Sequence, residues 1–253
     1  MRTKSLLAVA AVLLIGGAST LVASHSWGNY HWARTANPAT LKVGDNVDAN
    51  WDGYLNEAVT DWNQSTVLQL SKVAGGANPK NCRPTAGRIE VCNSKYGQNG
   101  WLGIAQIWAS GNHITQATSK LNDTYFNTAK YDKAEWRRLV MCQEIAHDFG
   151  LDHQDEVFDN ANLGSCMDYT GNPLGPPSNE HPNQHDFDQL VTIYGGHLDS
   201  STTTSQTSPG SAGQIDRGQF GRLMRSTNGG RTELYLLDEG NGRRIFTFVI
   251  WAD

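Results

Sequence analysis

The feature that most constrains this chain is a spaced set of polar residues, Gln143-Glu144-x-x-His147-x-x-Gly150-x-x-His153. Apolar residues at helical spacing predict a helix from about Asp132 to Phe149, and the glycine that follows ends it. Because residues four apart lie on one helix face, Gln143 and His147 point the same way, with Glu144 one step round. His153 returns to the same place after the turn. The spacing therefore predicts a three-ligand metal site with an open position and a carboxylate beside it.

This set resembles the zinc-binding sequence of the metzincin metallopeptidases, His-Glu-x-x-His-x-x-Gly-x-x-His, except that Gln143 stands where the family has its first histidine. Further along, Ser165-Cys166-Met167-Asp168-Tyr169 resembles the Met-turn of the same family. In the astacin and serralysin branches, a tyrosine two residues after that methionine lies near the zinc, and Tyr169 has this position. The resemblance covers residues 30–195 loosely, and only residues 143–169 carry specific sequence.

The resemblance implies an α+β fold of the metzincin kind, similar to matrixins, snapalysins and astacins. Such a fold has a twisted mixed sheet with an edge strand, an active-site helix, a Met-turn and a C-terminal helix. A strand within residues 103–110 would be the edge strand, which holds an extended peptide by backbone pairing. The implied activity is that of a zinc-dependent endopeptidase, with proteins or peptides as its substrates.

The resemblance also implies a role for each site residue. Zn²⁺ would be held by three side chains, those of Gln143, His147 and His153. Met167 would form a hydrophobic floor beneath the metal. Glu144 would act as the general base on water, and Tyr169 would stabilise the oxyanion.

Gln143 is the departure that matters, because an amide oxygen is a poorer zinc donor than a neutral imidazole. Gln143 is nevertheless of similar reach and could coordinate zinc through its side-chain oxygen. Another side chain could instead complete the site, and the candidates are His113, Asp155, Glu156, His181 and His185. In a third alternative the site is degenerate, and the chain is a catalytically inactive, secreted protein-binding module. The presence of Glu144 together with the rest of the motif favours an active peptidase.

The N-terminus is typical of a secretory signal peptide over residues 1–24. Arg2 and Lys4 precede an apolar run from Leu6 to Ile15, and small residues follow it. The apolar run is too short to span a bilayer comfortably. We therefore expect a secreted, extracellular protein that has no membrane contact after the signal peptide is removed.

Export makes the four cysteines informative, because an even number in an oxidising compartment favours disulfides. We expect Cys82–Cys92 as a local bridge and Cys142–Cys166 as a long-range one. In the metzincin resemblance, the second bridge would tie the active-site helix to the Met-turn.

Composition divides the rest of the chain into a main domain, a linker and a tail. Residues 25–198 are evenly mixed and rich in tryptophan, as in a packed domain, whereas residues 199–213 form a Ser/Thr-rich polar linker. Residues 214–253 hold two strand-like runs around Asn241-Gly242, which predicts a short β-hairpin tail of unknown role. Because an isolated hairpin is marginal in water, we expect this tail to dock on another surface. Within that domain, periodicity predicts helices at 52–63 and 184–194 and strands at 67–73, 88–92, 103–108 and 113–120.

Other polar residues have ordinary structural interpretations. His25 and His31 are expected on the surface, and the remaining histidines outside the motif are expected to face solvent or cap helices: His113, His181, His185 and His197. The acidic residues between 152 and 159 predict a solvated loop, with Ca²⁺ a minor option because no EF-hand spacing is present. A net charge of −5 without a Lys/Arg run predicts no nucleic-acid partner. We expect a monomer.

Overall fold

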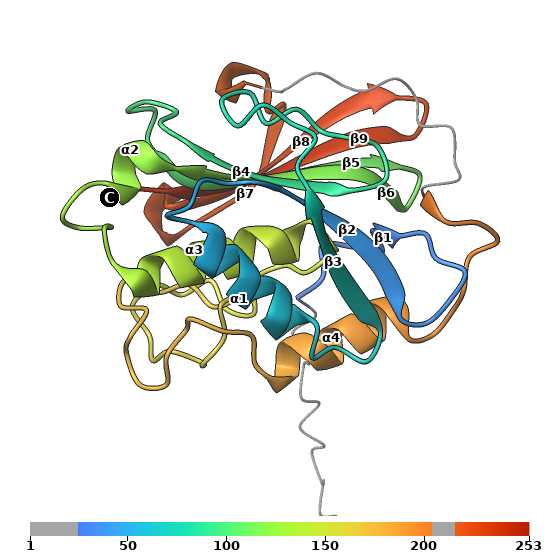
Figure 1. The fold of residues 1–253 in the computed structure, drawn as a ribbon, viewed down its shortest axis with the longest axis horizontal. Helices are drawn as coiled ribbons and strands as arrows, with labels where there is room; N and C mark the ends of the chain where they lie inside the picture. The colour runs from blue at the N-terminus through green and yellow to red at the C-terminus, as the bar shows by residue number, and fades with distance from the viewer. Residues whose placement is uncertain (1–24, 204–215, 253) are drawn as a thin grey trace, which may run out of the picture.

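The computed structural model describes residues 25–203 and 216–252, so the predicted signal peptide and most of the predicted linker lie outside the described residues. Within these ranges the strands form one mixed sheet in the order β3-β2-β4-β6-β5-β9-β8-β7, and β1 pairs with β6 (Figure 1). The strands are β1 (His31–Trp32), β2 (Ala39–Asn46), β3 (Leu68–Ala74), β4 (Ile89–Ser94), β5 (Trp101–Ser110), β6 (His113–Asn122), β7 (Arg222–Thr227), β8 (Thr232–Gly240) and β9 (Arg243–Trp251). The helices are α1 (Asp52–Trp62), α2 (Asp123–Phe126), α3 (Ala134–His147) and α4 (Gln184–Tyr194), with 3₁₀ turns at Arg217–Gln219 and Asn228–Gly230.

The sheet is parallel in its first half and antiparallel in its second. β3, β2, β4 and β6 pair in parallel, whereas β5, β9, β8 and β7 continue the sheet with antiparallel pairing. β5 and β6 are buried along almost their whole length; β5 is mostly apolar, whereas β6 buries several polar side chains. The mixed sheet with few helices fits the α+β class expected from the sequence.

Helices α1, α3 and α4 lie on one side of the sheet (Figure 1). α3 packs against α1 and against β5 and β6, and the residues of its last three turns are almost all buried. The helix ends after His147, and Gly150 turns the chain with a φ of +107°. A side chain at Gly150 would place its Cβ 2.7 Å from the carbonyl oxygen of Tyr30, so both the turn and the close approach require glycine.

The structure contains disulfides between the cysteine pairs expected from the sequence, Cys82–Cys92 and Cys142–Cys166. The second bridge joins α3 to the segment that contains Met167. Among residues 25–203 and 216–252, no helix combines the length and apolar character needed to cross a membrane.

The tail differs from the expected short hairpin. β8 and β9 do pair antiparallel, but β7 extends them to three strands, and β9 pairs along β5 from Trp101 to Ser110. The expectation that β5 is an edge strand is therefore wrong in this structure. The physical reason is that an edge strand has a row of unpaired N–H and C=O groups, and the tail supplies their partner.

The first part of the predicted linker also packs on the main domain. The backbone N–H of Asp199 donates to the carbonyl of Arg34 at 2.7 Å, and that of Thr203 donates to the carbonyl of Ala33 at 3.2 Å. The side chains of Thr203 and Asp199 also accept hydrogen bonds, from the backbone N–H groups of Ala33 and Arg34, and polar composition alone gave no sign of this packing.

Candidate metal centre

Two histidines converge at the end of α3. Nε2 of His147, the last residue of α3, lies 3.1 Å from Nε2 of His153, and the two rings are almost perpendicular at 86°. Nδ1 of His147 lies 2.8 Å from the carbonyl oxygen of Leu151, which holds its proton there and leaves Nε2 as the free ligand atom. Ligand atoms of a tetrahedral zinc site lie about 3.4 Å apart. Both side chains are buried, so the pair has the geometry of two metal ligands.

Glu144 lies on the same helix and is fully buried. Within the described residues neither of its carboxylate oxygens has a hydrogen-bond partner. Burial, with a contribution from the nearby Asp148 carboxylate, holds the pKa of Glu144 well above its usual range. Such an orphaned buried carboxylate is costly unless a cation or a water binds it. An orphaned buried carboxylate three residues before one of two converging imidazoles is compatible with a bound zinc ion.

Gln143 lies one helical turn before His147 and is 1% exposed. Its Nε2 has no hydrogen-bond partner among the described residues. A buried amide nitrogen without a hydrogen-bond partner is unfavourable, and because it is a donor it cannot itself bind a cation.

The alternative third ligands are engaged elsewhere or approach the wrong atom. His113 lies 3.0 Å from Asp199, His181 lies 2.7 Å from Asp61, and His185 stacks on His25. Asp155 accepts hydrogen bonds from the backbone of Val157 and from the side chain of Asn160. Glu156 lies 3.4 Å from Nδ1 of His153, whereas the metal position faces Nε2. The five alternative side chains thus have other contacts, and Glu156 lies with Asp152 and His153 in a group that could itself hold a metal ion.

Met167 and Tyr169 lie next to the two histidines. Met167 is fully buried, and its carbonyl accepts a hydrogen bond from the N–H of Gln154 at 2.6 Å, directly after His153. The ring of Tyr169 lies 4.6 Å from that of His153 at 70°. Burial raises the pKa of Tyr169 well above its ordinary value, so its hydroxyl is a hydrogen-bond donor at neutral pH. The structure thus brings His147, His153 and Tyr169 together.

Residues of the tail cover this centre, and the sequence analysis did not find them. The ring of Phe248 on β9 stacks on His147 with centroids 4.1 Å apart and an interplanar angle of 9°. Arg225 on β7 binds the carboxylates of Asp152 and Glu156, the latter at 2.8 Å. Asp152, which we expected in a solvated loop, is buried beneath this arginine. Strand propensity pointed to the element that contains Phe248, whereas no sequence pattern pointed to Arg225.

An apolar pocket lies beside Gln143. Its walls come from α3, residues 168–170 and the end of β9, and include Leu139, Val140, Tyr169, Ile250 and Trp251. The tail therefore closes a pocket that the main domain alone would leave open.

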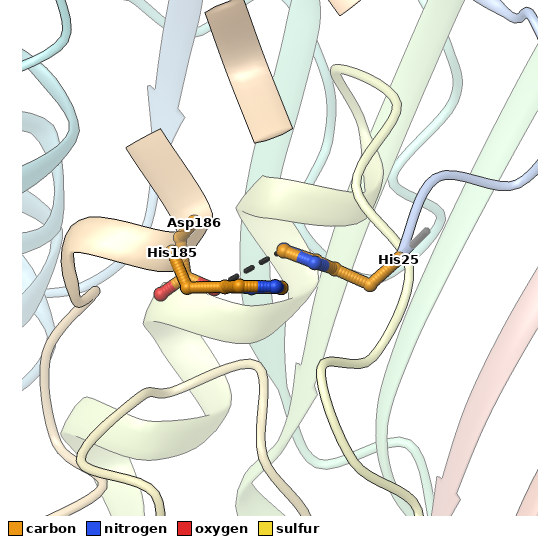
Figure 2. A group of neighbouring side chains, drawn as sticks. All are labelled: His25, His185 and Asp186. Atoms are coloured by element: carbon orange, nitrogen blue, oxygen red, sulfur yellow. Dashed lines mark ion pairs between the residues drawn. The ribbon is translucent and has the colours of Figure 1, made fainter. Parts of the chain in front are cut away.

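His25 and His31 are buried, contrary to the expectation that they lie on the surface. Figure 2 shows the ring of His25 beside that of His185, with Asp186 next to them at the start of α4; the ring centroids are 4.5 Å apart and the planes differ by 20°. Nε2 of His25 lies 3.3 Å from the Asp186 carboxylate. This contact ties the N-terminal segment to α4.

No protein-family model matches this sequence, and no curated protein is similar to it at a significant level. Among solved structures, the chain is similar to myroilysin, with 12% identity, a TM-score of 0.37, and coverage of 70% of this chain and 98% of that one. It is also similar to high choriolytic enzyme 1, a hatching enzyme zinc-protease from Oryzias latipes (medaka fish), with 11% identity, a TM-score of 0.33, and coverage of 66% and 95%. Similarity this low carries no assignment of function, which depends on the site residues themselves.

Proposed function

We propose that this chain is a secreted zinc-dependent endopeptidase. The observation that supports the proposal is the convergence of two imidazole Nε2 atoms, 3.1 Å apart, beside the buried and unpartnered carboxylate of Glu144. A structural zinc site is normally closed by four protein ligands, whereas a catalytic one has fewer and retains a neighbouring acid or base.

Each side chain of the centre has a role in peptide hydrolysis. His147, His153 and the amide oxygen of Gln143 would hold the zinc ion, which when bound supplies a Lewis acid that polarises the peptide carbonyl. Glu144 takes the proton from the attacking water and passes it to the leaving amine. Tyr169 donates a hydrogen bond to the developing oxyanion.

The proposal is tested with the full chain, by measuring zinc content and the digestion of casein. We expect bound zinc, and we expect activity that is lost in Glu144→Ala while zinc stays bound. Absence of zinc, or activity unchanged in Glu144→Ala, would refute the peptidase assignment.

The role of Gln143 requires its own comparison. We expect Gln143→Ala to weaken zinc binding and Gln143→His to strengthen it, because imidazole is the better donor. Gln189→Ala, which removes a buried glutamine on α4, is the matched control. Unchanged zinc affinity in Gln143→Ala would show that another side chain is the third ligand.

One observation favours the alternative of an inactive protein-binding module. Phe248 packs on His147, so a peptide cannot reach the centre in the conformation described. The alternative predicts that no variant that loosens the tail gains activity.

A further inference from the structure

Three segments that are distant in sequence meet at a second group of histidines. His31 comes from β1, His113 from the first position of β6, and His197 and Asp199 from the chain after α4. Nε2 of His31 lies 3.1 Å from Nε2 of His197. The Asp199 carboxylate lies 3.7 Å from the first of these atoms and 3.9 Å from the second.

These separations are those of ligand atoms around one small cation. Donors at tetrahedral zinc are about 3.4 Å apart, and the three observed values bracket that figure. The rings of His31 and His197 are perpendicular, with centroids 4.7 Å apart and an angle of 86°, so their Nε2 lone pairs converge. The rings of His25 and His185 are stacked instead. The nitrogen lone pairs of an imidazole lie in the plane of its ring, so those of two stacked rings do not point at a common position.

The outer contacts also match those of metal ligands, whose second nitrogen or oxygen is normally hydrogen-bonded. Nδ1 of His31 lies 2.7 Å from the carbonyl oxygen of Asn29, which leaves Nε2 unprotonated in the neutral ring. Burial lowers the pKa of His31, which favours that neutral ring. Oδ2 of Asp199, which faces His31, accepts a hydrogen bond from the backbone N–H of Arg34 at 2.9 Å. Oδ1, which faces His197, lies 3.0 Å from Nε2 of His113.

The same arrangement occurs at the proposed catalytic centre. There too, two Nε2 atoms lie 3.1 Å apart, and the Nδ1 of one ring faces a backbone carbonyl. We propose that His31, His197 and Asp199 supply three ligands of a second zinc site, with water as the fourth ligand and His113 positioning the Asp199 carboxylate. The site would fasten the chain after α4 to β1. It does not depend on the peptidase assignment.

The test is the zinc stoichiometry of the full chain after removal of metal and titration with zinc alone. We expect about two zinc ions per chain in the wild type and about one in His197→Gln, with the same loss in His31→Gln. His181→Gln, which removes a half-exposed histidine paired with Asp61, is the matched control and should retain both. Retention of both ions in His197→Gln overturns the proposal.

Cobalt provides a readout that a folding defect does not imitate. His197 is partly exposed and follows α4, so His197→Gln should fold, which circular dichroism checks. In His153→Gln, Co²⁺ should still give the absorption bands of a four-coordinate site, and these bands should vanish in the double variant His153→Gln/His197→Gln. Bands that vanish already in His153→Gln overturn the second site. Loss of zinc in His197→Gln alone, with none in His153→Gln, supports the second site while contradicting the catalytic one.

The tail supports a second inference, from separate observations. β9 lies antiparallel along β5, where an extended peptide would pair with an open strand edge. Phe248 covers His147, Ile250 lines the apolar pocket beside Gln143, and Arg225 binds the carboxylates next to His153. One stretch of the chain thus occupies the strand edge, the metal centre and the pocket together.

We infer that the tail is an intramolecular inhibitor that occupies the place of an extended peptide substrate. This inference rests on the proposed peptidase function. Because Ile250 of the tail lines the apolar pocket, the substrate that replaces the tail should carry an apolar side chain at the corresponding position.

The test compares two arginine variants of the full chain. Arg225→Gln removes the contacts to Asp152 and Glu156, whereas Arg243→Gln removes a contact to Glu239 within the tail. Charge-assisted contacts of this kind, one third exposed, should shift the opening of the tail by about 5- to 30-fold. We expect Arg225→Gln to raise peptide cleavage and the hydrogen exchange of β5 amides by that factor, and Arg243→Gln to change neither.

The two readouts separate the inference from the function on which it rests. Faster exchange of β5 amides with unchanged, Glu144-dependent cleavage would overturn the inhibitory role alone. Faster exchange with no cleavage in any variant would overturn the peptidase function. Unchanged exchange in Arg225→Gln would show that Arg225 does not hold the tail, and would overturn the inference as stated.

Discussion

Gly103→Ala should impair catalysis through Glu144. Gly103 lies on β5 where that strand crosses α3, and a Cβ added there would lie 2.4 Å from Oε1 of Glu144 and 2.6 Å from Cγ1 of Val140. Ordinary van der Waals contact begins at 3.4 Å, so the carboxylate must retreat by about 1 Å. A misplacement of about 1 Å can lower a catalysed rate by about 100-fold. The overpacking itself should cost about 1–3 kcal/mol of stability.

The assay measures kcat for a quenched fluorescent peptide, with zinc content and urea unfolding measured on the same samples. The matched control is Gly53→Ala, because a Cβ at Gly53 in α1 meets nothing within 4 Å. Alanine in a helix is favoured over glycine by about 0.5–1 kcal/mol, so the control should gain stability and retain its rate. Measurement in the Arg225→Gln background uncovers the centre and raises the signal.

A rate for Gly103→Ala within about twofold of the wild type, at equal zinc content, would refute this reasoning. It would mean either that the carboxylate of Glu144 is not at the described position in the active conformation, or that its position does not limit the rate. Loss of zinc along with the rate would indicate a displaced helix rather than a displaced base.

Three further predictions concern stability. Burial lowers the pKa of Lys120 from 10.5 to about 8, so between these pH values the unfolded chain binds one more proton than the folded chain. The free energy of unfolding should therefore rise by about 3 kcal/mol as the pH rises across this range. Urea unfolding at several pH values should show that Lys120→Met loses most of this rise. Replacing Cys142 and Cys166 by serine should cost about 2–4 kcal/mol and weaken zinc binding, as read from melting and zinc titration, because the bridge ties α3 to the segment beneath the metal. Phe248→Ala should cost about 3–5 kcal/mol in the same melting assay, since the ring is 1% exposed. Equal stability of wild type and Phe248→Ala would mean that the tail is not docked in solution.

The parts of the fold that the sequence predicted are those with a local pattern. α4 occupies Gln184–Tyr194 as expected, because its apolar residues have helical spacing and Asn183 forms a capping box with Asp186. β7 was missed because most of its residues are exposed, so no alternation marks a buried face. β2 was missed although its first residues alternate between buried and exposed.

The candidate site shows the same division. Gln143, Glu144 and His147 lie within two turns of one helix, and a single glycine turn brings back His153, so short-range geometry determines their relation. Phe248 lies about a hundred residues further along the chain. Its place depends on which strand edge the tail pairs with, and backbone pairing of that kind leaves no residue-specific mark in the sequence.

The sequence of β5 nevertheless contained one sign that another segment covers this strand. If β5 were an open edge strand, its face away from α3 would contact water. That face nevertheless contains two large apolar side chains, those of Trp101 and Ile104. In the structure they are buried against Phe220 and Val249 of the tail. Departure of the whole tail would expose this second apolar cluster, which is unfavourable in water. Because Val249 of β9 belongs to this cluster, a peptide that replaces β9 should carry an apolar side chain opposite Ile104, where Val249 now lies.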